Sequence, residues 1–132
     1  MVAALTNEAA TASVRAKLRD LSPRDTLVSD WVTTEVSSAL ALKVRKGALS
    51  EARRTLALAA YRDFITSSFT VLPVLAHQFQ AAARHADRHD LNLRAGDALH
   101  LAIAADHGAA LLTLDRRLHA ACLALGVVVE AV

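Results

Sequence analysis

Short apolar runs alternate with longer segments of helical periodicity, and this alternation constrains the fold more than any other feature of the sequence. Strands are expected at about 26–29, 69–74, 109–114 and 127–129. Helices are expected at about 2–21, 31–46, 50–64, 76–89, 98–105 and 115–125. This order is typical of an α/β domain with a mostly parallel sheet, and we expect a single domain spanning residues 1–132.

The composition excludes several classes of protein. Apolar residues make up 54% of the chain, too many for a disordered protein, and four glycines and two prolines exclude collagen. Cys122 is the only cysteine, so no internal disulfide can form and a cytoplasmic location is expected. No apolar run approaches the roughly 20 residues of a membrane span, and the first residues do not resemble a signal peptide, so no membrane association is expected.

Three acidic residues stand where a carboxylate is costly. Glu35 has apolar neighbours one and two turns away on its predicted helix. Asp97 opens a nearly all-apolar helix, and Asp115 directly follows the third predicted strand, at the end where ligands bind in open α/β sheets. A carboxylate packed against apolar surface must be paired, protonated or bound to a cation. If these acids converge, Mg²⁺ or Mn²⁺ would relieve their repulsion and would activate water for attack on a phosphodiester.

Each acid also has a purely structural interpretation. Asp115 is suited to cap the helix that contains Arg116 and Arg117, Asp97 is favoured by the dipole at a helix start, and Glu35 could pair with a core arginine. His85 and His89 have the helical i, i+4 spacing of a Zn²⁺ pair, but a solvated helix face explains them better.

The basic residues give weaker evidence. The net charge of +2 is too balanced to indicate nucleic-acid binding by itself, and solvated helix ends explain most of the basic groups. Arg94 and Arg116 neighbour two of the acids, so they are the best candidates for holding an RNA backbone.

Several segments spread over the whole chain have a distinctive sequence. They are TLVSD at 26–30 followed by TEVSSAL at 34–40, LRAGDALHLA at 93–102, and LLTLDRRL at 111–118. These segments resemble PIN-domain proteins, and the subgroup of VapC toxins from type II toxin–antitoxin pairs most of all. The first two resemble the second strand and acidic helix of that family, the others resemble its later site motifs, and RAGDALH at 94–100 is the most specific part.

The resemblance implies a Mg²⁺- or Mn²⁺-dependent endoribonuclease with a three-layer α/β/α fold. By position, Glu35, Asp97 and Asp115 match the family's catalytic and metal-binding acids, and Thr113 matches a small hydroxyl residue near that site. The implied partners are an RNA substrate, a cognate VapB-like antitoxin and a second copy of the chain in a homodimer. A catalytically weak or inactive binding module that pairs with an antitoxin is the alternative.

One feature of the family has no counterpart in the sequence. The family begins with a central strand that ends in an aspartate, whereas residues 2–6 look like the helix after that strand. A start codon set too late, a decayed gene, or another segment or subunit in the gap would each explain the difference, and we favour the first. Asp30 is the nearest possible substitute for the aspartate, although a helix-cap role explains it better.

Overall fold

The computed structural model describes residue 16, residue 22 and residues 25–131, in two compact units that span Met1–Pro73 and Val74–Val132. The predicted helix at 2–21 lies outside the described residues, except Ala16, which is helical. The mixed α/β class with parallel strands is confirmed. The expectation of one domain over 1–132 stays a prediction.

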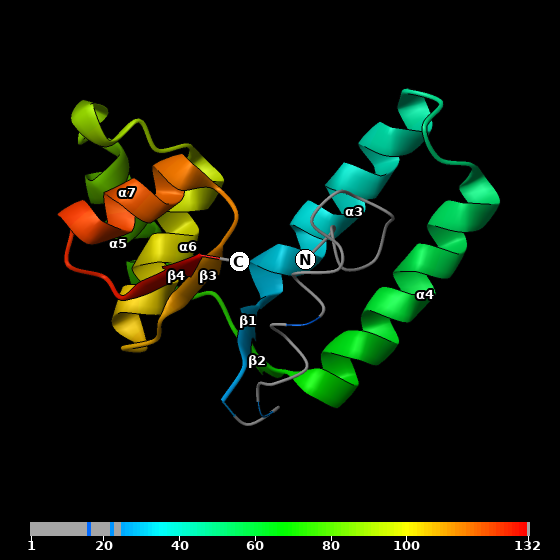
Figure 1. Cartoon of the computed structure of the whole chain (residues 1–132), viewed down its shortest axis with the longest axis horizontal. Helices are drawn as coiled ribbons and strands as arrows, with labels where there is room; N and C mark the ends of the chain where they lie inside the picture. Colours follow the sequence, from blue (N-terminus) through cyan, green and yellow to red (C-terminus); the bar gives the residue numbers. More distant parts are fainter. Residues whose placement is uncertain (1–15, 17–21, 23–24, 132) are drawn as a thin grey trace. The chain divides into compact units, whose positions relative to one another are not determined.

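The first unit contains a parallel strand pair and a helical hairpin. Strand β1 (Leu27–Ser29) leads into α3 (Asp30–Arg45), and α4 (Glu51–Ser68) returns the chain to β2 (Thr70–Leu72). Strands β1 and β2 pair in parallel with Val28 opposite Val71. Figure 1 shows α3 and α4 side by side as two antiparallel helices, and the turn between them uses Gly47 at φ 70°. That left-handed conformation favours glycine, as expected at a helix end.

The core of the first unit lies where α3, α4 and β1 meet. Its buried members are Val28, Val36, Leu40, Tyr61 and Ile65. The hydroxyls of Thr33 and Tyr61 form a 2.9 Å hydrogen bond that links α3 to α4. The rings of Phe64 and Phe69 meet edge to face with centroids 5.2 Å apart. This contact packs the last turns of α4 against Phe69, the residue between α4 and β2.

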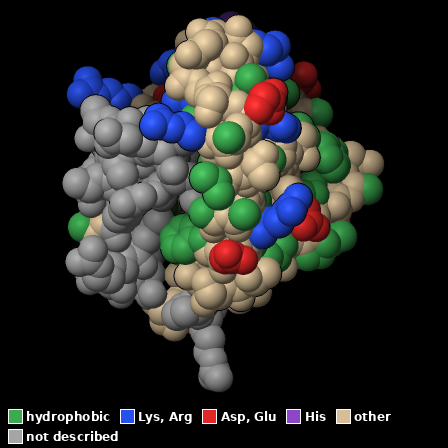
Figure 2. All heavy atoms as spheres, turned by 90° about the vertical axis from the view of Figure 1, so that its right-hand side faces the viewer, with side chains coloured by type: hydrophobic (Ala, Val, Ile, Leu, Met, Phe, Trp, Pro, Cys, Tyr) green, Lys and Arg blue, Asp and Glu red, His purple; other side chains and the backbone are tan. Residues whose placement is uncertain are grey.

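The outward face of α4 has a mixed character. Figure 2 faces this helix and shows hydrophobic side chains interspersed with arginine and acidic side chains. Leu56 is 70% exposed, and Arg62 and Asp63 are also exposed. Single exposed leucines of this kind are normal on protein surfaces and do not by themselves mark an interface.

The second unit is built around one buried helix. Its elements are α5 (Ala76–Ala86), the 3₁₀ turn η1 (His89–Leu91), α6 (Ala95–Asp106), β3 (Leu111–Thr113), α7 (Arg116–Ala124) and β4 (Val129–Ala131). Helix α6 packs against both α5 and α7. Six of its residues are buried, as its apolar sequence predicts: Ala98, Leu99, Leu101, Ala102, Ile103 and Ala104. Strands β3 and β4 pair in parallel on either side of α7 in the chain.

Several observed boundaries differ from the predicted ones for local reasons. Helix α4 runs to Ser68 rather than about residue 64, and the hydroxyls of Thr66 and Ser67 donate to carbonyl oxygens one turn earlier. The last strand begins at Val129 rather than residue 127, because the Val127 N–H donates to the carbonyl of Cys122 and so still belongs to the end of α7. The described strands form two separate pairs, one in each unit.

A membrane-spanning element was not expected from the sequence. No helix in the described part of the chain combines the length and the apolar character needed to cross a bilayer.

Candidate active site

Asp115 lies at the junction between β3 and α7 and is held by several hydrogen bonds. It is the N-cap of α7, and its Oδ1 accepts from the backbone N–H groups of Arg117 at 2.7 Å and Leu118 at 3.3 Å. Its own N–H donates to Thr113 Oγ1 at 3.0 Å. The sequence-based interpretation of Asp115 as a helix cap is therefore confirmed, and the same bonds fix the carboxylate at the carboxyl end of β3.

Arg117 pairs with Asp115, and its charge also interacts weakly with that of Asp97. The Arg117 Nη2 donates to Asp115 Oδ2 at 3.2 Å, and this bond, together with the backbone amides, lowers the pKa of Asp115. The hydrogen bond and charge of Asp115 raise the pKa of Arg117, and the charge of Asp97 raises it further. Two of the three predicted acids thus interact with one guanidinium, which was not among the predicted site residues.

Asp97 occupies the first turn of the buried helix. Its side chain is half-buried, and its Oδ2 accepts a 3.3 Å hydrogen bond from the backbone N–H of Arg94, the N-cap residue of α6. The buried residues that follow fix the position of this helix start in the unit. Arg94 itself is exposed, so its guanidinium is accessible beside the acid.

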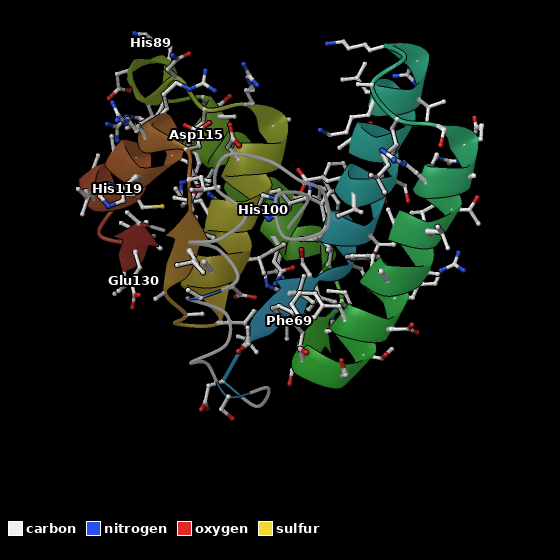
Figure 3. All side chains as sticks on the ribbon, turned by 45° about the vertical axis from the view of Figure 1, so that its right-hand side comes forward. Phe69, His89, His100, Asp115, His119 and Glu130 are labelled. Carbon is white, nitrogen blue, oxygen red and sulfur yellow. The ribbon has the colours of Figure 1, made fainter. Side chains whose placement is uncertain are left out.

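A shallow pocket of about 180 Å³ adjoins Asp115. It is lined by Thr113, Leu114, Asp115, Arg116, His119 and Ala131. Figure 3 shows Asp115 at the start of α7 and His119 further along the same helix. Thr113 and Arg116, both predicted as site residues, therefore share this pocket with Asp115. The sequence analysis missed His119, although its spacing of one turn from Asp115 is a signal that could have identified it.

Glu35 and Asp30 belong to the first unit. Glu35 is half-buried in α3, and Asp30 is the exposed first residue of that helix. Ser29, rather than Asp30, is the N-cap residue, and its side chain makes no capping bond. The convergence of Glu35 with Asp97 and Asp115 stays a prediction.

The carboxylates of the second unit have the chemistry of a divalent-cation site. Mg²⁺ and Mn²⁺ prefer carboxylate oxygens, and a cation would take over the role that Arg117 plays in neutralising Asp115. Among the described residues, no group of three His, Cys, Asp or Glu side chains could hold a metal ion. The third acid expected at the site, Glu35, is in the other unit.

The histidine pair at 85 and 89 does not have the geometry that its sequence spacing suggested. Helix α5 ends at Ala86, so His85 is helical while His89 begins the separate η1 turn. Burial and the nearby charge of Arg84 lower the pKa of His85. The i, i+4 spacing on one helix, on which the Zn²⁺ interpretation depended, is absent.

A second polar cluster joins α5 to α6. Asp106 Oδ2 accepts from Gln78 Nε2 at 2.8 Å and lies 2.9 Å from His77 Nε2. Gln78 is fully buried, and its Oε1 accepts from the Leu75 N–H at 2.9 Å. These bonds lower the pKa of Asp106, with the bond from Gln78 as the largest cause. Because the polar atoms named here are paired with one another, the cluster is explained by its role in fastening two helices.

Comparison with protein families gives one match. A family model described as the PIN domain matches residues 1–123. No curated protein matches the chain.

Proposed function

Because the chain belongs to the PIN domain family, we propose that it is a divalent-metal-dependent endoribonuclease of the cytoplasm, similar to the VapC toxins of type II toxin–antitoxin pairs. PIN domains are generally nucleases. The observation that carries the proposal for this chain is the Asp115 carboxylate, which the α7 amides and Arg117 hold at the carboxyl end of β3. Asp115 shares its pocket with Thr113 and Arg116, which the family resemblance and the sequence also assigned to the site.

The proposed site residues have different tasks. Glu35, Asp97 and Asp115 would hold Mg²⁺ or Mn²⁺, which when bound supplies an activated water molecule for attack on a phosphodiester. The α7 amides and the Thr113 hydroxyl fix the position of Asp115. The exposed side chains of Arg94 and Arg116 would hold the RNA backbone by pairing with phosphate oxygens.

Arg117 would act before the cation binds. Its guanidinium pairs with Asp115 Oδ2 at 3.2 Å and so stabilises that carboxylate in the free protein. With a cation in place, Arg117 would be free to pair with a phosphate of the substrate instead. An arginine can therefore pair with an acid that is proposed as a metal ligand.

Cleavage of a random-sequence single-stranded RNA pool tests the proposal. The full chain is incubated with the pool in Mg²⁺, in Mn²⁺ and in a chelator, and products are resolved by electrophoresis. We expect cleavage only with the metal ions, and a loss of about 100-fold or more in rate for Asp97→Asn, Asp115→Asn and Glu35→Gln. Asp63→Asn, which changes an exposed acid of α4, is the matched control and should cleave normally. Cleavage that persists in chelator or in Asp97→Asn would contradict the proposal.

The bond between Arg117 and Asp115 also favours a second candidate function. An arginine of an antitoxin peptide could replace Arg117 on that carboxylate, so the chain would be a binding module with weak or no activity. This candidate predicts no cleavage at high Mn²⁺, together with calorimetric binding of an arginine-containing peptide that Asp115→Asn abolishes. We propose that either form is a homodimer, which sedimentation measurements would establish.

A further inference from the structure

Two buried polar atoms at the junction between β1 and α3 have no hydrogen-bond partner among the residues that the structure describes. They are the Oγ of Ser29, a residue that is only 5% exposed, and the Nε1 of Trp31 in the first turn of α3. Buried polar atoms in native proteins are almost always hydrogen-bonded, so each exception calls for an explanation. Two such atoms within three consecutive residues indicate that this junction takes a partner which the described residues do not supply.

The helix itself does not explain the orientation of Ser29. Serine is favoured at an N-cap because its Oγ accepts a bond from an N–H in the first helical turn, but Ser29 makes no such bond. Ser50, the N-cap of α4 in the same unit, does accept one from the Arg53 N–H at 3.3 Å. The Ser29 hydroxyl therefore lacks the bond to a backbone N–H of the first helical turn that an N-cap serine usually accepts.

The packing of α3 against α4 does not explain the unpaired atoms of Ser29 and Trp31 either. Thr33 lies on the same helix, and its hydroxyl is bonded to Tyr61 across the interface with α4. Arg54 Nε is the third unpaired buried atom among the described residues, but it lies in α4 and its guanidinium already pairs with Glu51 at 3.6 Å. Only the β1–α3 junction contains two neighbouring side chains whose donor groups lack a partner among the residues described.

The position of the junction indicates the kind of partner. It lies at the carboxyl end of β1, which pairs in parallel with β2, and this end of parallel strands is where ligands bind. Glu35 stands one turn beyond Trp31 on α3, so the two side chains share one side of the helix. A hydroxyl and an indole N–H both donate hydrogen bonds, and a donor shielded from water binds an anionic oxygen most strongly.

We propose that Ser29 Oγ and Trp31 Nε1 bind a phosphate oxygen of the RNA backbone beside the bond that is cleaved. This inference depends on the proposed function, and it adds two substrate-binding residues on β1 and α3 to the acids already named. Removing one bond to a charged group should weaken RNA binding about 10-fold. The cost of the two unpaired atoms in the free chain is then offset when substrate binds.

The first measurement uses the single tryptophan of the chain as its own reporter. The non-cleaving Asp97→Asn chain is titrated with the random-sequence RNA pool in Mg²⁺. We expect a saturable red shift of Trp31 emission, because the indole N–H gains a polar partner. In the same background, Ser29→Ala should bind labelled RNA about 10-fold more weakly by anisotropy, and Trp31→Phe should do likewise. RNA binding without an emission shift, and with unchanged affinity in both variants, would overturn the inference.

The second measurement separates substrate binding from a structural role. Because neither atom has a partner in the free chain, Ser29→Ala should leave the thermal midpoint of unfolding unchanged or raise it. Thr33→Val, which removes a bonded hydroxyl from the same helix, is the matched control and should lower the midpoint. A lower midpoint in Ser29→Ala together with unchanged RNA affinity would show that the hydroxyl holds a structural water only, and would overturn the inference.

The outcomes also distinguish this inference from the proposed function. If the unmodified chain cleaves RNA in Mg²⁺ while Ser29→Ala and Trp31→Phe bind RNA as tightly as their parent, the ribonuclease proposal stands and only this inference fails. If the unmodified chain neither cleaves nor binds the RNA pool, the proposed function fails first.

Discussion

Two junctions in the described part of the chain, β1–α3 and β3–α7, each lead from a parallel strand into a helix, but their polar groups are hydrogen-bonded differently. At the β3–α7 junction, Asp115 caps the helix, its N–H is bonded to Thr113, and its second oxygen is bonded to Arg117. At the β1–α3 junction, Ser29 is the N-cap residue but makes no capping bond, and Trp31 Nε1 is buried without a partner in the described part of the chain. The described residues therefore supply the hydrogen bonds of the β3–α7 junction but not those of the β1–α3 junction.

This difference indicates that one junction contributes to the stability of the fold and the other to substrate binding. A bonded cap lowers the free energy of the folded chain, whereas a buried donor without a partner raises it. We therefore expect substitutions at the β3–α7 junction to cost stability as well as activity, and those at the β1–α3 junction to affect substrate binding alone.

The largest effect on stability is expected for Asp115→Ala. The substitution removes the cap of α7, and losses of about 1 to 2 kcal/mol in the free energy of unfolding are typical of such changes. Asp115→Asn keeps an oxygen that can accept from the α7 amides, so it should lose less stability while losing the nuclease activity. Urea denaturation followed by circular dichroism measures the free energy of unfolding of each variant. Equal losses in the two variants would show that the charge, rather than the cap, stabilises this junction.

The next largest effect on stability is expected for Thr113→Val, with a loss of about 1 kcal/mol in the free energy of unfolding. It preserves the shape of the side chain but leaves the Asp115 N–H without its acceptor. Ser29→Ala is the matched change at the other junction, and there no loss is expected. If Ser29→Ala costs as much as Thr113→Val, the comparison between the two junctions is wrong.

The sequence predicted the fold better than it predicted the hydrogen bonding. The nearly all-apolar stretch after Asp97 predicted the buried helix α6, although that helix begins at Ala95 rather than at about residue 98. Helix ends were displaced where single hydrogen bonds decide them, as with Val127 at the end of α7. Strand length was overestimated at Ala109–Leu114, because hydropathy alone does not distinguish β3 from the apolar residues that flank it.

The hydrogen bonds around Asp115 were only partly predictable. Asp115 was proposed as a site residue because a carboxylate directly follows an apolar strand, and Thr113 was proposed only because it matches a position in the family that the chain resembles. Arg117 was missed because the sequence pattern does not distinguish it from its neighbour Arg116. Only the course of the helix backbone determines which of the two guanidinium groups reaches Asp115. The unpaired state of Ser29 and Trp31 has no sequence signal, since a serine before a helix normally predicts a bonded cap.

The pH dependence of stability should change in Asp115→Asn. Bonds from Arg117 and the α7 amides lower the pKa of Asp115, so its carboxylate stabilises the folded chain at neutral pH. That contribution is present above the usual aspartate pKa of about 4 and is lost as the pH falls through the lower folded value. The thermal midpoints of the unmodified chain and Asp115→Asn should therefore converge on acidification. A gap that widens toward low pH would contradict this account.

The smallest effect on stability is expected for Arg117→Gln. Arg117 and Asp115 are both partly exposed to solvent, and ion pairs of this kind contribute little to stability and are weakened by salt. The midpoint should change slightly at low salt and not at all at high salt, which scanning calorimetry in both buffers would measure. Mn²⁺ affinity is the sharper measurement, because Arg117 would compete with a bound cation for the Asp115 carboxylate. Arg117→Gln should bind Mn²⁺ more tightly by calorimetry, and weaker binding would show that Arg117 supports the metal site instead of competing with it.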